Sequence, residues 1–220
     1  KIFDDDIRRF DQFKQVIQGK KVLDFGCGAG GFLRLCRKND FDCIGLEIQP
    51  GARQALCDAG LSCVEKLSEI EDESLDFIML FHVFEHLQEP VEMLRHLKMK
   101  LNEGGKIIVE VPQANDVLLS LFDFEPFKDF TFWSEHLVLH TKSSLTKFGE
   151  LAGMLVESVV GYQRYPLSNH LYWLCNRKPG GHEVWDFLDN SELSAAWAKT
   201  LDSNDMTDTI IATLLKQELS

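Results

Sequence analysis

The sequence lacks the patterns that mark membrane and secreted proteins. Its 220 residues contain no apolar run of about 18 residues, so no transmembrane helix is expected. No basic start followed by an apolar stretch indicates a signal peptide. The six cysteines form no C-x-x-C pair, which argues against a zinc site and a disulfide framework. We therefore expect a cytoplasmic protein without a metal ion or membrane partner. Because the sequence begins at Lys1, whether another domain precedes it stays open.

Basic residues are also scarce. The chain has 23 Lys and Arg against 35 Asp and Glu, which gives a formal net charge of −12. Proteins that bind DNA or RNA phosphates present a basic face, so no nucleic acid is expected as a partner. The excess of acid is explained well enough by the solubility of a cytoplasmic protein. With 45% hydrophobic residues the chain can bury a core, and its length suits a single domain, residues 1–220, with an insertion.

What the chain does contain is an alternation of strand and helix patterns. A lead-in helix is expected at 7–17, where apolar residues recur at helical spacing. Strands are expected at 21–25, 43–47, 61–64, 75–81, 105–111, 155–162 and 207–215, and helices at 32–39, 50–59, 90–101 and 143–152. Such alternation predicts an α/β fold with a mainly parallel sheet, helices on both faces and right-handed crossovers.

Two segments break this alternation. The first carries dense aromatic side chains with no regular period: Phe122, Phe124, Phe127, Phe130, Phe132 and Trp133. We interpret residues 118–142 as an aromatic lid that folds over a bound ligand. The second, residues 165–205, is too long for a simple loop, and 183–201 within it looks helical. It is predicted to be a helical insertion before the last strand.

A cluster of glycines follows the first predicted strand, in the sequence DFGCGAGG of residues 24–31. A strand that ends in closely spaced glycines before a helix lets a ligand approach the backbone and meet a helix N-terminus. The glycines alone do not identify the ligand. Gly26, Gly28 and Gly31 fit the G-x-G-x-x-G of dinucleotide sites, whereas Gly26, Gly28 and Gly30 give a tighter alternating form.

Two carboxylates distinguish between these ligands. Asp24 precedes the first glycine by two residues and would lie badly beside a pyrophosphate, but it suits the ammonium group of S-adenosylmethionine. Glu47 ends the next predicted strand, 21 residues after Gly26. A carboxylate there can accept hydrogen bonds from both ribose hydroxyls. The pair favours S-adenosylmethionine over a nicotinamide cofactor.

These residues resemble the class I S-adenosylmethionine-dependent methyltransferases. Residues 22–30 look like the first motif of that family, 45–47 like its acidic motif, 74–86 like its fourth-strand motif, and 101–105 like the turn before strand five. The resemblance implies a Rossmann-like sheet of seven strands, with the last strand antiparallel beside the fifth. It assigns the cofactor to Asp24, Gly26, Cys27, Gly28, Gly30, Glu47, Ile48, Phe81 and His82. The acidic residue that usually follows strand three has no match, so no adenine contact is assigned.

Methyl transfer needs an aligned nucleophile and, for oxygen or carbon, a base that removes its proton. Residues 132–140 resemble the Glu-His element of sugar C-methyltransferases and related enzymes of glycan assembly. The tyrosine that precedes the element in those enzymes is absent here, which weakens the case for C-methylation. His136 is therefore the expected base, because histidine titrates near neutral pH. Glu135 is its expected orienting partner, and His82 is the competing candidate.

The acceptor is expected to be a small molecule, with a sugar or glycan precursor favoured. Aromatic faces with amide and imidazole donors suit sugar rings, although they suit the core of a helical hairpin equally well. The residues assigned to acceptor binding are His86, Trp133, His140, Asn169 and His170. Two other readings stay open: a protein that keeps the fold as a scaffold without catalysis, and a nicotinamide-dependent oxidoreductase. A homodimer also stays open.

Overall fold

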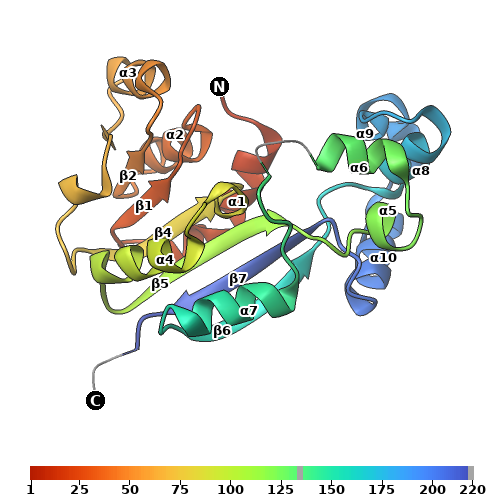
Figure 1. Ribbon diagram of the computed structural model, residues 1–220. Coiled ribbons are helices and arrows are strands. Elements are labelled where there is room, and N and C mark those ends of the chain that lie inside the picture. The colour runs from red at the N-terminus through yellow and green to blue at the C-terminus, as the bar shows by residue number, and fades with distance from the viewer. Residues whose placement is uncertain (133–135, 218–220) are drawn as a thin grey trace.

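A computed structural model describes residues 1–132 and 136–217, and within them seven strands form one sheet in the order β3-β2-β1-β4-β5-β7-β6 (Figure 1). The strands are β1 Val22–Phe25, β2 Cys43–Leu46, β3 Cys63–Val64, β4 Leu75–Phe81, β5 Leu101–Pro112, β6 Leu155–Tyr162 and β7 Thr209–Leu215. Neighbouring strands from β3 to β5 are parallel, and β7 pairs antiparallel with both β5 and β6. The Rossmann-like fold predicted from the sequence is confirmed.

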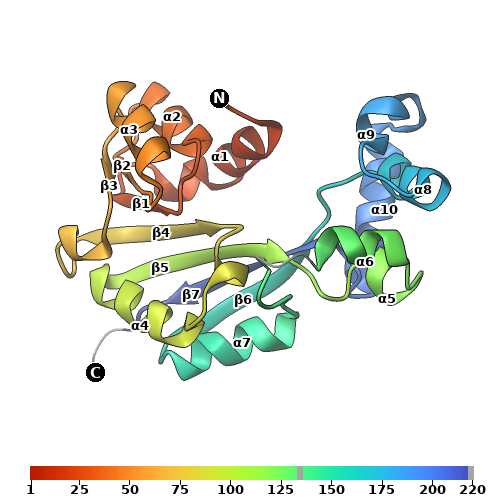
Figure 2. The same cartoon turned by 45° about the horizontal axis from the view of Figure 1, so that its top comes forward.

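Helices cover both faces of this sheet and also form a lobe at one end of it (Figures 1 and 2). Those that cover the sheet are α1 Asp4–Ile17, α2 Gly31–Lys38, α3 Pro50–Asp58, α4 Pro90–Lys100 and α7 Lys142–Leu151. The lobe contains α5 Val117–Ser120, α6 Glu125–Thr131, α8 Leu167–Asn176, α9 Gly181–Val184 and α10 Ser191–Ser203. Short 3-10 turns are η1 Leu67–Glu69, η2 Phe84–His86 and η3 Asp186–Leu188.

The observed bounds differ from the predicted ones mainly near the turns. The strands β4 and β6 begin and end where the sequence predicts, but β5 starts at Leu101, directly after α4, instead of at 105. The single helix predicted over 183–201 is divided into α9, η3 and α10. It is interrupted because the side chain of Asn190 accepts a hydrogen bond from the Leu193 N–H and starts a new helix there. The helix α8 was not predicted.

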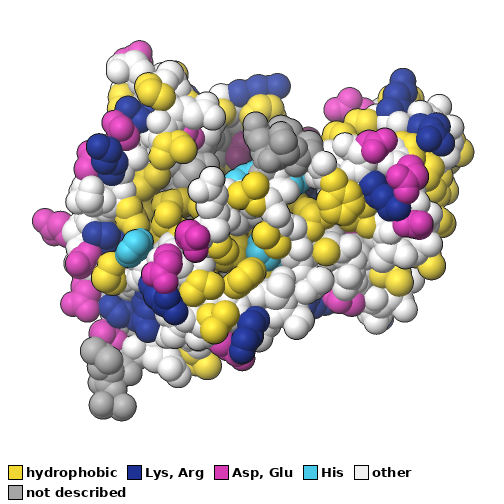
Figure 3. Space-filling model, viewed as in Figure 1, with side chains coloured by type: hydrophobic (Ala, Val, Ile, Leu, Met, Phe, Trp, Pro, Cys, Tyr) yellow, Lys and Arg dark blue, Asp and Glu magenta, His cyan; other side chains and the backbone are white. Residues whose placement is uncertain are grey.

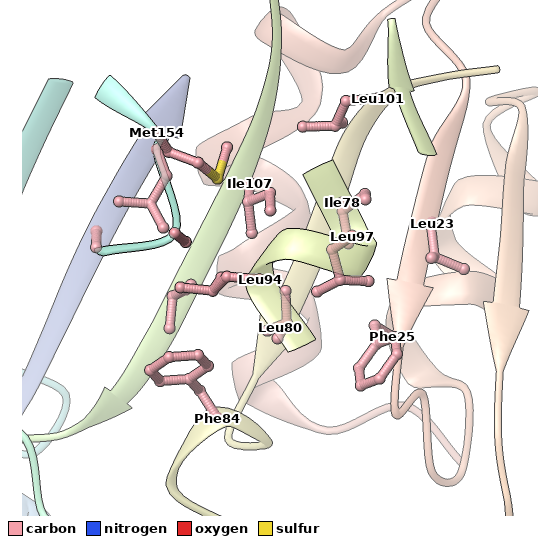
Figure 4. Close-up of a cluster of buried hydrophobic side chains, with 14 of the residues drawn as sticks. Leu23, Phe25, Ile78, Leu80, Phe84, Leu94, Leu97, Leu101, Ile107 and Met154 are labelled. Atoms are coloured by element: carbon pink, nitrogen blue, oxygen red, sulfur yellow. The ribbon is translucent and has the colours of Figure 1, made fainter. Parts of the chain in front are cut away.

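The pleat of β4 divides its side chains between two cores, since successive residues of a strand point to opposite faces. Ile78 and Leu80 pack with Leu94 and Leu97 of α4 in the cluster drawn in Figure 4. On the other face, Phe77 and Met79 pack against phenylalanines of α1 and α2: Phe10, Phe13 and Phe32. Each fully buried side chain of this size contributes about 1.5–3 kcal/mol to stability, so both helical layers are held firmly to the sheet.

A charged group lies within the second of these cores. The alternation that turns Ile108 of β5 toward α1 also turns Glu110 that way, and its side chain is fully buried. Glu110 Oε1 lies 2.6 Å from Arg8 Nη2 and 2.7 Å from Arg9 Nη2, and both arginines belong to α1. The guanidinium groups compensate the buried carboxylate, which is the condition under which such a charge is tolerated. The N-terminal helix is thus tied to the middle of the sheet.

The two segments that break the sequence pattern fold together. Val117 and Leu118 of α5 share a hydrophobic cluster with Trp173 of α8 and Leu201 of α10. Figures 1 and 2 both show α6 close to α8 in this lobe, although α8 follows α6 in the chain only after α7 and β6. The predicted lid and the predicted insertion therefore bury one common core. Among the described residues, no helix is long and apolar enough to cross a membrane.

Candidate active site

The glycine cluster forms the loop between β1 and α2. Gly26, Gly28 and Gly30 have φ of +74°, +51° and +69°, in the left-handed region where only glycine is free of strain. A Cβ atom on Gly26 would lie 2.6 Å from Val83, and one on Gly30 would lie 2.4 Å from Leu56. A Cβ atom on Gly28 would meet nothing within 4 Å. The middle of the loop therefore presents bare backbone to open space, where a ligand can approach it.

Glu47 lies beside this loop, directly after β2. Its Oε2 accepts a hydrogen bond of 2.9 Å from the Gly28 N–H, and its Oε1 accepts one of 2.7 Å from the Gln49 N–H. A carboxylate oxygen has a second lone pair, so each can still accept from a hydroxyl. Glu47 and Gly28 line a recess of about 430 Å³. Ile48, the next residue, is 73% exposed and offers an apolar surface beside it.

Asp24 is buried at the base of the same loop. Burial raises the pKa of its carboxyl to about 7, against the opposing charge of Arg9. The negative charge of an ionised Asp24 is thus only partly compensated by Arg9. A positively charged group of a ligand would favour the ionised form. The contact between Asp24 and an ammonium group of the cofactor stays a prediction.

Two of the residues predicted to contact the cofactor have other partners. Cys27 points its thiol at Cys63, with 3.9 Å between the sulfur atoms, and burial raises the pKa of that thiol. Phe81 packs against Phe32 and Phe13, with ring centroids at 5.3 and 6.1 Å. Both side chains are thus engaged within the protein, that of Cys27 with Cys63 and that of Phe81 with the core beneath α1 and α2.

His82 follows β4 with a left-handed backbone, φ +55°, which is strained for a residue with a side chain. Its Nε2 lies 3.1 Å from Nη1 of Arg164, and its Nδ1 lies 3.2 Å from Oε1 of Glu85. Because a guanidinium can only donate, Nε2 is the acceptor, and Nδ1 carries the proton that it donates to Glu85. Both ring nitrogens are engaged, so His82 fits a bridging role better than that of a base.

A larger cavity of about 760 Å³ lies between the sheet and the lobe. One wall carries Glu85, His86 and His136. Another part of the lining, from α5 and α6, is apolar: Leu118, Leu119, Phe127 and Phe130. In the view of Figure 3, histidine side chains lie near the middle of the molecule, where the sheet and its covering helices meet the lobe. The predicted lid segment thus contributes an apolar wall to the cavity.

The backbone holds His136 beside η2. The carbonyl of Glu85 accepts a hydrogen bond of 3.0 Å from the N–H of Leu137, the residue after His136. The rings of His86 and His136 lie with their centroids 5.1 Å apart. His136 Nδ1 is 2.8 Å from the carbonyl oxygen of Thr131. Since a carbonyl only accepts, Nδ1 carries the proton, and Nε2 is the basic nitrogen.

Three of the five residues assigned to acceptor binding, His86, Asn169 and His170, line the cavity. His170 is fixed by the indole N–H of Trp197, which donates to its Nδ1 at 3.1 Å, and burial lowers its pKa to about 4. The Asn169 Oδ1 accepts from the Gly181 N–H at 3.1 Å and so joins α8 to α9. Trp133, like the proposed orienting residue Glu135, lies outside the described residues.

His140 is misplaced in the sequence-based assignment. Its side chain is fully buried between Phe84 and Phe148, with ring centroids at 5.2 and 5.5 Å, and it does not line the cavity. The His140 carbonyl accepts from the Ala114 N–H at 2.7 Å, which fixes the segment against the end of β5. Burial lowers the pKa of this imidazole to about 4. His140 is a core residue.

Several cavity residues were not predicted. Arg164 and Tyr165 follow β6, and both backbone N–H groups donate to Asp208, whose carboxylate is buried. Arg164 also forms an ion pair with Asp5 of α1. Asp116 caps α5 by accepting from the Leu118 N–H at 2.6 Å. The available signal was positional: Arg164, Tyr165 and Asp116 follow strands and Asp208 precedes one, all at or near the end of the sheet that carries the glycine loop.

Comparisons with known proteins agree with this geometry. Residues 4–159 match a family model described as a methyltransferase domain. The ubiquinone biosynthesis O-methyltransferase of Aeromonas salmonicida is 23% identical over 168 residues, which cover 69% of each protein. The chloroplastic tocopherol O-methyltransferase of Arabidopsis thaliana is 30% identical over 102 residues, 41% of this chain and 29% of that enzyme. A crystal structure of a SAM dependent methyltransferase from Archaeoglobus fulgidus superposes with a TM-score of 0.65 at 19% identity, covering 95% of this chain and 92% of the other.

Proposed function

Because the chain belongs to the methyltransferase-domain family and is a methyltransferase that uses S-adenosylmethionine, we propose that it methylates a hydroxyl oxygen of a small ring compound. The observation that carries the proposal is the cavity of about 760 Å³ with one apolar wall and one wall of carboxylate and imidazole groups. An apolar ring fits the first wall, and a hydroxyl attached to it meets the second.

The cofactor has a matching place at the glycine loop. Bare backbone at Gly28, the acceptor oxygens of Glu47 and the undercompensated carboxyl of Asp24 suit the backbone approach, ribose and ammonium group of S-adenosylmethionine. When bound, this cofactor supplies an electrophilic methyl group on a sulfonium. The carboxyl ends of β1, β2, β4 and β5 bring the loop and the acceptor cavity to the same edge of the sheet.

Proton removal from the acceptor is assigned to the cluster of Glu85, His86 and His136. The sequence assigned this task to His136, and the structure supports it by holding the protonated Nδ1 on the Thr131 carbonyl. Among the described residues the carboxylate beside it is that of Glu85, and the predicted orienting residue Glu135 lies outside them. A base positioned in this way removes a proton as the oxygen attacks.

The class of ring is the finer part of the proposal. The Glu-His element resembles enzymes of glycan assembly, which supports a sugar or glycan precursor. The two relatives are named for ubiquinone biosynthesis and tocopherol, which supports a phenol. A sugar and a phenol each carry a hydroxyl on a ring, and that hydroxyl would accept the methyl group. The net charge of −12 and the carboxylates of the cavity support a small molecule over a nucleic acid.

The test supplies methyl-labelled S-adenosylmethionine with two panels of acceptors, one of phenols and catechols and one of nucleotide sugars. We expect labelled product from one panel, with the label shown by mass spectrometry on an oxygen of the acceptor. Label on a nitrogen or carbon atom, or none with either panel while the cofactor binds, would contradict the proposal.

Replacing Glu47 by alanine should weaken binding of S-adenosylmethionine. The change removes the acceptor for two ribose hydroxyls, and each charge-assisted hydrogen bond contributes at most about 1.5–3 kcal/mol. It also releases the Gly28 N–H, which loosens the loop. Titration calorimetry measures the effect. Glu92→Ala is the matched control, since Glu92 is an exposed acid that pairs with Arg95 on α4, away from the glycine loop; full affinity in Glu47→Ala would refute the ribose contact.

A further inference from the structure

We propose that Glu85, His86 and His136 bind one divalent transition-metal ion at the acceptor cavity. Each offers one ligand atom, and these three atoms lie within 4.8 Å of one another. All three residues line the cavity. The absence of paired cysteines predicted no metal site, but a carboxylate with two imidazoles forms a different kind of site, and its members come from two separate segments of the chain.

The burial of the Glu85 carboxylate is independent evidence for a bound cation. Glu85 is 1% exposed, and its Oε1 accepts from His82. Its Oε2 is buried without a hydrogen-bond partner among the described residues. An unsatisfied buried carboxylate oxygen costs several kcal/mol if it stays charged, and a cation is the partner that best compensates it. The orphaned oxygen belongs to the same side chain that completes the histidine cluster.

The spacing is close to that of a bound ion. Ligand atoms about 2.1 Å from a metal lie about 3–4.2 Å from one another, so the three side chains need to approach by less than about 1 Å each. His136 presents Nε2, because its Nδ1 carries a proton held by the Thr131 carbonyl. A ligand imidazole is usually oriented in this way by a hydrogen bond from its other nitrogen.

Two imidazoles and one carboxylate favour ions such as Mn²⁺, Fe²⁺, Co²⁺ or Zn²⁺ over Ca²⁺ or Mg²⁺. Three protein ligands leave coordination positions for the acceptor, as in catalytic sites. An ion there lowers the pKa of a bound hydroxyl and orients it. With the ion bound, His136 is a ligand in place of a base, and the proton passes to solvent before the oxygen takes the methyl group. This role rests on the proposed function, whereas binding of the ion does not.

The experiment titrates the chelator-treated full chain with Mn²⁺ and measures free Mn²⁺ by electron paramagnetic resonance, without cofactor or acceptor. We expect one ion per chain, and binding at least 10- to 100-fold weaker in His136→Ala and in Glu85→Gln. His96→Ala, which removes an exposed histidine of α4, should bind as the wild type does. Circular dichroism checks that each variant is folded, and the partly exposed His136 provides a test that does not disturb the core.

No Mn²⁺ binding to the wild type, or equal binding by wild type and His136→Ala, would overturn the metal site. Methyl transfer measured in parallel separates this result from the proposed function. If transfer to a hydroxyl continues in excess chelator, the role of the ion in catalysis is refuted and the function stands. If Mn²⁺ binds as expected and no hydroxyl compound is methylated with the ion present, the function is refuted and the site stands.

Discussion

Replacing His136 by alanine should lower the rate of methyl transfer by about 10²–10⁴-fold, the usual contribution of a group that assists proton transfer. Affinity for S-adenosylmethionine should stay unchanged, because His136 lines the proposed acceptor cavity, whereas Gly28 and Glu47, which are assigned to the cofactor, line a separate recess. Single-turnover kinetics measures the first quantity and titration calorimetry the second. The proposed ion would require the same imidazole, so its loss removes either form of assistance.

His82→Ala is the informative comparison. The ring of His82 lies between Glu85 and Arg164 and contacts both. His82 follows β4 and precedes Val83, whose side chain lies against Gly26 of the glycine loop. Its loss should reduce cofactor affinity as well as rate, whereas His136→Ala should reduce rate alone. Near-normal turnover in His136→Ala would transfer the assignment to His82 or His86, or show that the acceptor needs no help with its proton.

Glu110→Ala should lower the free energy of unfolding by about 3–5 kcal/mol, the cost of removing one partner of a buried ion pair. The substitution leaves Arg8 and Arg9, whose side chains are 17% and 11% exposed, without their carboxylate in the core under α1. Urea denaturation at pH 7 measures the loss. Glu157→Ala is the control on the same sheet, since its pair with Lys106 is partly exposed to solvent and should contribute no more than about 1 kcal/mol. Equal losses in the two variants would refute the importance of the buried network.

The same network makes stability depend on pH. Burial alone would raise the pKa of Glu110, but the guanidinium groups of Arg9 and Arg8 outweigh it and hold that pKa well below its usual range. A carboxyl whose pKa is lower in the folded state stabilises the fold fully above its unfolded pKa, about 4.3, and this contribution is lost as pH falls further. Wild type should therefore lose stability below about pH 4 more steeply than Glu110→Ala.

The sheet and the glycine loop could be predicted because their signals are local. The glycines, Asp24 and the strands at 75–81 and 155–162 each lie within a few consecutive residues, so spacing alone identifies them. The pairing of Glu110 with Arg9 spans 101 residues and depends on which face of β5 meets α1. Nothing in the spacing of the sequence encodes that contact.

The histidines show where prediction from a motif stops. His136 and His140 occur four residues apart in one short segment, and both were assigned to the site. The segment has no helix or strand in it, so no period fixes which side chain faces the cavity. Backbone contacts with Glu85 and Ala114 decide the matter, and they turn His136 toward the cavity and His140 into the core.

The position of β7 has a consequence for how the chain is made. During synthesis β6 leaves the ribosome before β7, yet among the described residues β6 pairs only with β7, which lies between it and β5. Until residues 209–215 emerge, both β5 and β6 present unpaired edges, and such edges promote association between chains. The lobe helices α8 to α10 are synthesised in that interval. A ribosome that stalls within the lobe would release a nascent chain with an incomplete sheet, which makes this stretch the point at which chaperones should matter most.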